Sequence, residues 1–125
     1  MRSRRGDAQR GRTAYRLGLR AEGFAAFLLR LKGYRILARR LKTPAGEIDM
    51  VVRRGRVLAL VEVKARGAGG LAVEALTPRQ QQRLQRAAAH FLGRNPSLSD
   101  LDLRFDMVLV APRSLPRHMA DAWRP

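Results

Sequence analysis

Four charged residues in two short apolar segments are the first candidates for chemistry. Glu47 and Asp49 lie in the segment EIDMVVR, and Glu62 and Lys64 lie in VLALVEVKA. Residues two apart in a strand point to the same face, so each pair should project together. Because a tight turn at 54–56 joins the segments into a hairpin, Asp49 and Glu62 can lie close across it. Two carboxylates so placed could hold one Mg²⁺ or Mn²⁺ ion, with a backbone carbonyl and waters completing the shell.

Lys64 would stand beside this carboxylate pair. Its ammonium group could orient an attacking water or neutralise charge on a phosphoryl oxygen. The alternative is a cross-strand salt link between Lys64 and Asp49 or Glu47, which adds little stability unless it is buried. Glu62 favours the metal site, because an unpaired charge within the most apolar strand of the chain is expensive.

Glu22 is a candidate third acid for the same site. Its helical neighbours at i−4, i+3 and i+4 are small: Gly18, Ala25 and Ala26. The face around Glu22 therefore has little bulk and could approach another surface closely. The alternative is an ordinary exposed acid that pairs with an arginine of the same helix.

The charge of the chain indicates the class of partner. Its 125 residues include 26 Lys plus Arg, of which 23 are Arg, against 10 Asp plus Glu, and the formal net charge is +16. Guanidinium groups suit phosphate oxygens, so nucleic acid is the leading partner class. The alternative is that the arginines only solvate the surface. Arg79, Arg83 and Arg86 share one face of a predicted helix and are expected to contact phosphates.

Composition excludes several other classes. The chain has no cysteine, which excludes a disulfide scaffold and a cysteine-ligated zinc site. No apolar run approaches the roughly 18 residues that span a bilayer, and the N-terminus lacks an apolar signal core. Hydrophobic residues make up 46%, which is enough for one packed domain. We therefore expect a soluble, cytoplasmic protein without a membrane partner.

The elements that must position these residues follow from periodicity and turn signals. A first helix, capped by Thr13 and ended by Gly33, should bury a stripe of Leu17, Ala21, Phe24, Leu28 and Leu31. Strands are expected at 34–42, 47–53, 57–65 and 103–110. Thr77 and Gln80 form a predicted capping box for a second helix over 78–92, with Leu84, Ala88 and Phe91 in the core. The order helix, three strands, helix, strand predicts an α/β or α+β fold with a mixed central sheet flanked by helices.

Two of these segments resemble a nuclease signature. Gly46-Glu47-Ile48-Asp49, twelve intervening residues and Glu62-Val63-Lys64 resemble the D-x(n)-E-x-K pattern of the PD-(D/E)XK superfamily. More closely, the chain resembles the bacterial YraN-like family of predicted endonucleases, which are similar to archaeal Holliday-junction resolvases. The matches occur in order over about residues 15–110: Ala21-Glu22, the segment 33–39, GEID, VEVK, Arg66 and Arg104-Phe105-Asp106.

The resemblance implies a restriction-endonuclease-like core with Asp49 and Glu62 as metal ligands. It further implies that Lys64 is the catalytic lysine and that Glu22 is an accessory acid; Glu47, on the face of Asp49, is counted with them. Arg40 and Arg66 join the three helix arginines as predicted nucleic-acid contacts. The family commonly has Asn where this chain has Arg40, and Lys where the second helix begins with Arg79-Gln80-Gln81.

The expected function is a Mg²⁺-dependent (or Mn²⁺-dependent) endonuclease that hydrolyses phosphodiester bonds in branched or structured DNA, with RNA not excluded as substrate. A homodimer is expected because resolvases of similar fold cut two strands. Residues 1–12 should be a disordered basic arm, 13–111 the nuclease-like domain and 112–125 an irregular tail. One alternative is a non-catalytic nucleic-acid-binding accessory protein of the same fold. Another is a ribosome-associated basic protein, which leaves GEID and VEVK without a purpose.

Overall fold

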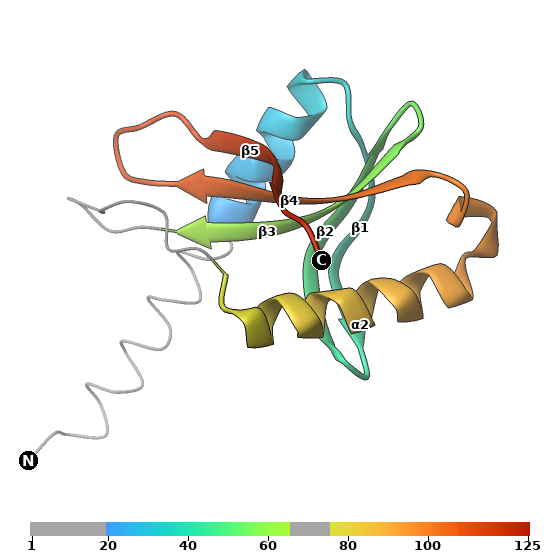
Figure 1. Cartoon of the computed structure of the whole chain (residues 1–125). Coiled ribbons are helices and arrows are strands. Elements are labelled where there is room, and N and C mark those ends of the chain that lie inside the picture. Colours follow the sequence, from blue (N-terminus) through green and yellow to red (C-terminus); the bar gives the residue numbers. More distant parts are fainter. Residues whose placement is uncertain (1–19, 66–75) are drawn as a thin grey trace, which may run out of the picture.

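Five strands form one mixed sheet in the part of the chain that the structure describes. The structure is a computed structural model, which describes residues 20–65 and 76–125. The strands are β1 (Arg35–Thr43), β2 (Gly46–Arg54), β3 (Val57–Ala65), β4 (Asp102–Val110) and β5 (Arg117–Trp123), and they lie side by side in this order (Figure 1). β1, β2 and β3 pair antiparallel, β3 and β4 pair parallel, and β5 returns antiparallel to β4. The predicted mixed sheet is therefore confirmed.

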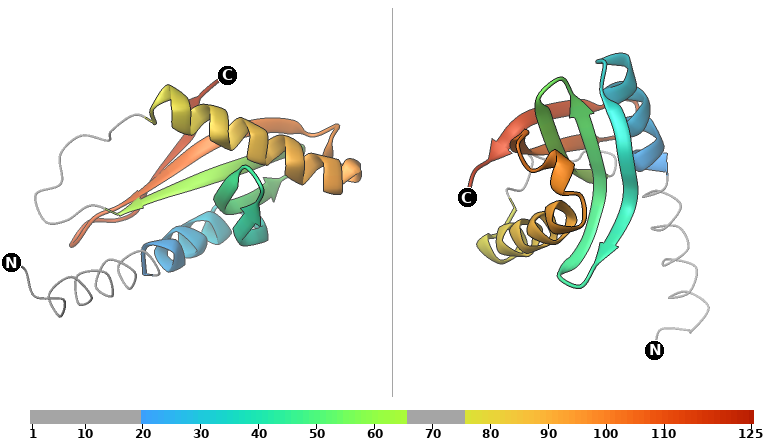
Figure 2. Two further views of the ribbon diagram at one scale, coloured as in Figure 1. Left: turned by 90° about the horizontal axis from the view of Figure 1, so that it is seen from below. Right: turned by 90° about the vertical axis from the view of Figure 1, so that its right-hand side faces the viewer.

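One helix covers each face of the sheet. An N-terminal helix, described over residues 20–31, lies on one face, and α2 (Pro78–Arg94) lies on the other; the right-hand view of Figure 2 shows the sheet between them. A parallel strand pair needs a crossover connection, and α2 lies within the one between β3 and β4. A short 3₁₀ helix, η1 (Pro96–Leu98), follows α2. The predicted strands and second helix are confirmed within two residues at each end.

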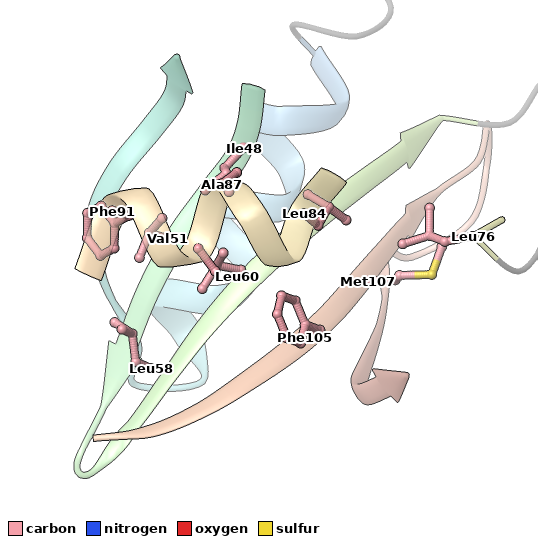
Figure 3. Close-up of a cluster of buried hydrophobic side chains, with 11 residues drawn as sticks. Ile48, Val51, Leu58, Leu60, Leu76, Leu84, Ala87, Phe91, Phe105 and Met107 are labelled. Carbon is pink, nitrogen blue, oxygen red and sulfur yellow. The ribbon is translucent and has the colours of Figure 1, made fainter. Parts of the chain in front are cut away.

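The start of α2 is fixed by its capping residues. The Thr77 hydroxyl accepts a hydrogen bond from the Gln80 amide at 3.2 Å, and the Gln80 side chain accepts one from the Thr77 amide at 2.9 Å. These two bonds satisfy amides that have no partner within the helix, so the predicted capping box is confirmed. Leu84, Ala87, Ala88 and Phe91 are buried against the sheet, with Leu58, Leu60 and Phe105 facing them (Figure 3).

The predicted stripe of the N-terminal helix is only partly correct: Ala21 is buried and Leu28 is partly buried, but the rest of the buried face differs. Ala21, Ala25 and Leu29 are buried, whereas Phe24 and Leu31 keep 55% and 70% of their surface exposed. The helix has apolar residues on two faces, and its small residues allow a closer approach to the sheet than the large ones. The stripe of larger residues was therefore the wrong choice for the core. Leu17 and the predicted cap Thr13 lie outside the described residues, as does the predicted basic arm.

The tail after β4 is not irregular throughout, contrary to the prediction for residues 112–125. Its residues Arg117–Trp123 form β5, and the Trp123 ring stacks on Phe105 with the ring centroids 4.2 Å apart. The prolines of the tail all lie outside this strand, so none removes a donor from the strand pairing. β5 forms because its neighbour β4 offers a partner edge, and the tail alone gives no sign of that edge.

Candidate functional site

Asp49 and Glu62 lie where β2 and β3 diverge. Met50 and Val61 are the last paired residues at this end, and Asp49 and Glu62 occupy the next position along the two strands. Here the Asp49 carboxylate accepts a hydrogen bond from the Val63 amide at 2.8 Å. This bond holds the two strands at the junction and fixes the orientation of Asp49.

The Glu62 side chain has one buried oxygen without a hydrogen-bond donor among the described residues. Its Oε1 lies 3.6 Å from the Lys64 Nζ, on the same side of β3. Its Oε2 is buried and has no hydrogen-bond partner among the described residues. A buried carboxylate oxygen without a donor costs free energy, so a cation bound at this atom would be stabilising.

The pKa values of Glu62 and Asp49 are both raised, which shows that their surroundings disfavour the charged forms. Burial, reinforced by the charge of Asp49, raises the pKa of Glu62 to about 7, against the opposing effects of Lys64 and Arg83. Burial also raises the pKa of Asp49, with the Val63 amide opposing and the charge of Glu22 reinforcing. The charge of Asp49 thus hinders the ionisation of Glu62, and a divalent cation bound here would offset that repulsion. The residues present therefore fit the predicted metal.

Glu22 lies close enough to influence Asp49 but has a partner of its own. It is 7% exposed, and its Oε2 accepts a hydrogen bond of 2.7 Å from Arg40 Nε. Ala25 and Ala26 beside it are buried, so the prediction that this small face approaches another surface is confirmed. Across residues 20–65 and 76–125, no three acidic or histidine side chains gather closely enough to hold a metal. Among the described residues, the candidate site therefore has the two carboxylates of Asp49 and Glu62, with Glu22 as a neighbour.

Arg40 combines an ion pair with an unusual backbone. Its side chain is about one-third exposed, and its φ of +51° is left-handed, a conformation that residues with a Cβ rarely adopt. Its register neighbours Arg39 and Leu41 pair with β2 residues on either side of Asp49, so the strand brings Arg40 level with the site. Contact of Arg40 with nucleic acid stays a prediction.

Arg83 links α2 to the carboxylate pair. Its side chain lies on the backbone of Gly46, where a Cβ would come within 2.8 Å of the Arg83 Cδ. Gly46 has a φ of +143°, so both its backbone and its lack of a side chain suit this contact. Arg79 and Arg86 are exposed on the same helix. Glu47 is exposed beside Asp49, and Arg66 lies outside the described residues.

A second polar cluster surrounds Asp106 in β4, and the sequence indicated only part of it. Asp106 is 1% exposed; it accepts two hydrogen bonds of 2.8 Å from Arg104 and one of 2.7 Å shared with His118 Nε2. Arg104 also donates to the Tyr34 hydroxyl at 2.6 Å. These bonds give Asp106 a structural role. His118 gave no signal of its own, because its segment was expected to be irregular.

The fold and the site together define a mixed α/β domain that has a partly buried carboxylate pair and a lysine at a strand junction, beside a cationic helix. The chain belongs to the family described as "Uncharacterised protein family UPF0102", whose model matches residues 21–110. It is 72% identical to a UPF0102 protein of Parvibaculum lavamentivorans over 123 residues, which cover 98% of this chain and 92% of that one. It is 58% identical to a UPF0102 protein of Paramagnetospirillum magneticum over 115 residues, 89% of each chain. The predicted YraN-like family membership is confirmed at this level.

No helix in the described ranges is long and apolar enough to cross a membrane.

Proposed function

We propose that this protein is a Mg²⁺-dependent or Mn²⁺-dependent endonuclease with a restriction-endonuclease-like core, acting in the cytoplasm on phosphodiester bonds of DNA. The observation that supports this most directly is the buried Oε2 of Glu62, which has no donor among the described residues and lies in a pair with Asp49. A protein that only binds phosphates gains nothing from two partly buried carboxylates that repel them. A metal site explains both acids at once.

Each residue of the site has a role in this proposal. Asp49 and Glu62 hold the metal, which when bound supplies a polarised phosphoryl oxygen and a more acidic water. Asp49 is already oriented by the Val63 amide. Lys64 donates from its ammonium to the attacking water or to a phosphoryl oxygen, where it offsets the charge that develops during hydrolysis. Arg83 binds a phosphate oxygen beside the pair.

The substrate proposal rests on charge and on the resemblance to resolvases. A net charge of +16 favours any nucleic acid, and phosphate contacts from arginines carry little sequence information. Branched or structured DNA would then be selected by its shape. RNA is the competing substrate, and a homodimer would bring two sites to two strands.

A second candidate function is a non-catalytic nucleic-acid-binding accessory protein. The ion pair between Glu22 and Arg40 favours it, because it leaves two rather than three acids for the centre in the described residues. This alternative predicts DNA binding that is the same with and without divalent metal.

The test is metal-dependent cleavage by wild type, Asp49→Asn and Glu62→Gln. Mg²⁺ and Mn²⁺ are titrated against linear duplex, single-stranded and four-way-junction DNA and a matched RNA, and binding is measured in parallel in EDTA. We expect cleavage by wild type only, with binding retained by both variants. The matched control is Asp100→Asn, which neutralises an exposed acid outside the site and should cut normally. Absence of cleavage and of metal binding in wild type, with intact DNA binding, would establish the accessory-protein alternative.

A further inference from the structure

Four arginines and His90 form one stripe along α2, which extends beyond the proposed site. Arg79, Arg83, Arg86, His90 and Arg94 follow steps of four, three, four and four residues, which keep them on one side of the helix. The four arginines are exposed and His90 is half-buried. Because Arg83 rests on Gly46, the stripe lies on the flank of α2 that faces the hairpin of β1 and β2.

The far end of the stripe opens into a pocket of its own. The pocket, of about 370 Å³, lies between the end of β1 and the last turns of α2, and Lys42, His90 and Arg94 line it together with Phe91. Among the described residues, no acidic side chain lines it, and the side chains of Lys42, His90 and Arg94 make no hydrogen bond or ion pair there. Basic side chains that surround a hollow without any counter-charge are suited to an anion.

The position at a helix C-terminus does not cancel this attraction. The negative end of the helix dipole is equivalent to about half a charge, against the two full positive charges of Lys42 and Arg94. The last carbonyls of α2 are also engaged internally: the Asn95 side chain donates to the Phe91 carbonyl at 2.9 Å, and the Asn95 amide donates to the Leu92 carbonyl at 3.1 Å. The local field in the pocket is therefore set by Lys42, His90 and Arg94.

We propose that this pocket binds a backbone phosphate of a DNA duplex at a fixed distance from the phosphate that is cut. The inference rests on the proposed function for the position of the cut, which Arg83 marks on α2. From Arg83 to Arg94 the helix rises about 16 Å, at 1.5 Å per residue. With α2 parallel to the axis of a duplex, this length spans about five base pairs, because each base pair rises about 3.4 Å along that axis. A continuous stripe that ends in a pocket matches a polymer of phosphates, whereas a single small anion would need only the pocket.

The binding test uses the full chain in EDTA, so that cleavage plays no part. Affinity for a duplex of about three helical turns is measured over a salt series for wild type and for the pocket variant Lys42→Gln/Arg94→Gln. The matched control is Arg30→Gln/Arg117→Gln, which removes two exposed arginines that lie on the N-terminal helix and on β5 and have no partner among the described residues. We expect the pocket variant to lose about tenfold in affinity relative to the control. The slope of the logarithm of the binding constant against the logarithm of the salt concentration should be smaller by about 1, as loss of one phosphate contact requires.

Three outcomes would overturn the inference. The first is an equal change of slope in the pocket and control variants. The second is effective competition by a mononucleotide at equal phosphate concentration, which would indicate a site for a free nucleotide. The third is the absence of salt-dependent duplex binding by wild type.

A cleavage experiment shows whether the phosphate-pocket inference or the proposed nuclease function is wrong. In Mg²⁺, shortening the duplex to fewer than about five base pairs beyond the cut should remove the difference between wild type and the pocket variant. A slope difference without any cleavage would overturn the nuclease proposal and leave the phosphate pocket. Normal cleavage with equal slopes in the pocket and control variants would overturn the phosphate pocket and leave the nuclease proposal.

Discussion

Glu62 is the residue at which stability and the proposed activity conflict. Above pH 7, the metal-free protein holds a charged, buried carboxylate with one oxygen that has no donor among the described residues. We expect Glu62→Gln to raise the melting temperature of the metal-free protein at pH 8, because an amide avoids the desolvation of a charge. Addition of Mg²⁺ should raise the melting temperature of wild type but not of the variant. Equal stabilisation of both proteins by Mg²⁺, in thermal scans with and without EDTA, would contradict the assignment of Glu62 as a ligand.

Arg40 stabilises the neighbourhood of the site through Glu22. Replacement by Ala or by Asn removes the 2.7 Å ion pair and leaves a buried negative charge near Asp49, so both should destabilise the protein by about 2 kcal/mol or more. Asn tolerates a left-handed φ better than Ala, so Arg40→Asn should retain up to about 1 kcal/mol relative to Arg40→Ala.

Urea unfolding of both variants measures this difference. The control is the double variant Glu22→Gln/Arg40→Asn, in which no buried charge is left unpaired and part of the loss should be recovered. Full additivity of the two single changes would show that Glu22 and Arg40 do not depend on each other.

At the scale of elements, the sequence was most informative where a local interaction fixes the structure. The capping box of Thr77 and Gln80 predicts the start of α2, and the β-branched, apolar run at 57–65 predicts β3. The same hairpin pattern predicts that Asp49 and Glu62 lie at one junction. These features depend on neighbours along the chain, which are visible in the sequence.

Features that depend on distant contacts were missed or assigned to the wrong face. The N-terminal helix is apolar on two sides, and only its packing against the sheet selects Ala25 and Leu29 over Phe24. β5 forms against an edge that β4 provides. The partner of Glu22 was equally hidden, because Arg40 comes from a strand edge rather than from the same helix.

The attachment of β5 to β4 should depend on pH through Asp106. Burial acts to raise the pKa of Asp106, but hydrogen bonds with His118 and from Arg104 and the Asp121 amide outweigh it and lower the pKa to about 2. A carboxyl whose pKa is lower in the folded than in the unfolded protein stabilises the fold above its unfolded pKa, near 4, and loses this contribution as the pH falls through about 2.

The contribution is on the order of 2 kcal/mol. Unfolding free energies measured from pH 6 down to pH 2 should therefore fall more in wild type than in Asp106→Asn, which lacks the titrating group. The variant should be less stable at pH 6, because Arg104 loses its charged partner. Parallel pH profiles for the two proteins would show that Asp106 does not determine the acid sensitivity.

At the scale of the whole molecule, the proposed homodimer has a surface that suits it. Phe24, Phe27, Leu31 and Leu115 line an apolar groove of about 600 Å³ between the N-terminal helix and the loop that joins β4 to β5, and each exposes more than half of its surface. Contiguous apolar surface of this kind marks an interaction site. Among the described residues that line it, Arg113 is the one charged residue, in a chain with 26 basic residues. The groove is therefore where two copies with a net charge of +16 each could approach with little local repulsion.

This interface predicts opposite salt dependences for self-association and for DNA binding. Salt screens the repulsion between two like-charged copies and leaves the apolar contact intact, so the dimer should become tighter as salt rises. Salt weakens phosphate contacts, so the affinity for DNA should fall over the same range. Sedimentation equilibrium across a salt series should show this for wild type, while Phe27→Asp should be monomeric throughout and Leu103→Asp, outside the groove, should behave like wild type. A monomeric wild type at high salt would exclude the groove as a self-association site, because no remaining charge repulsion could then account for the absence of a dimer.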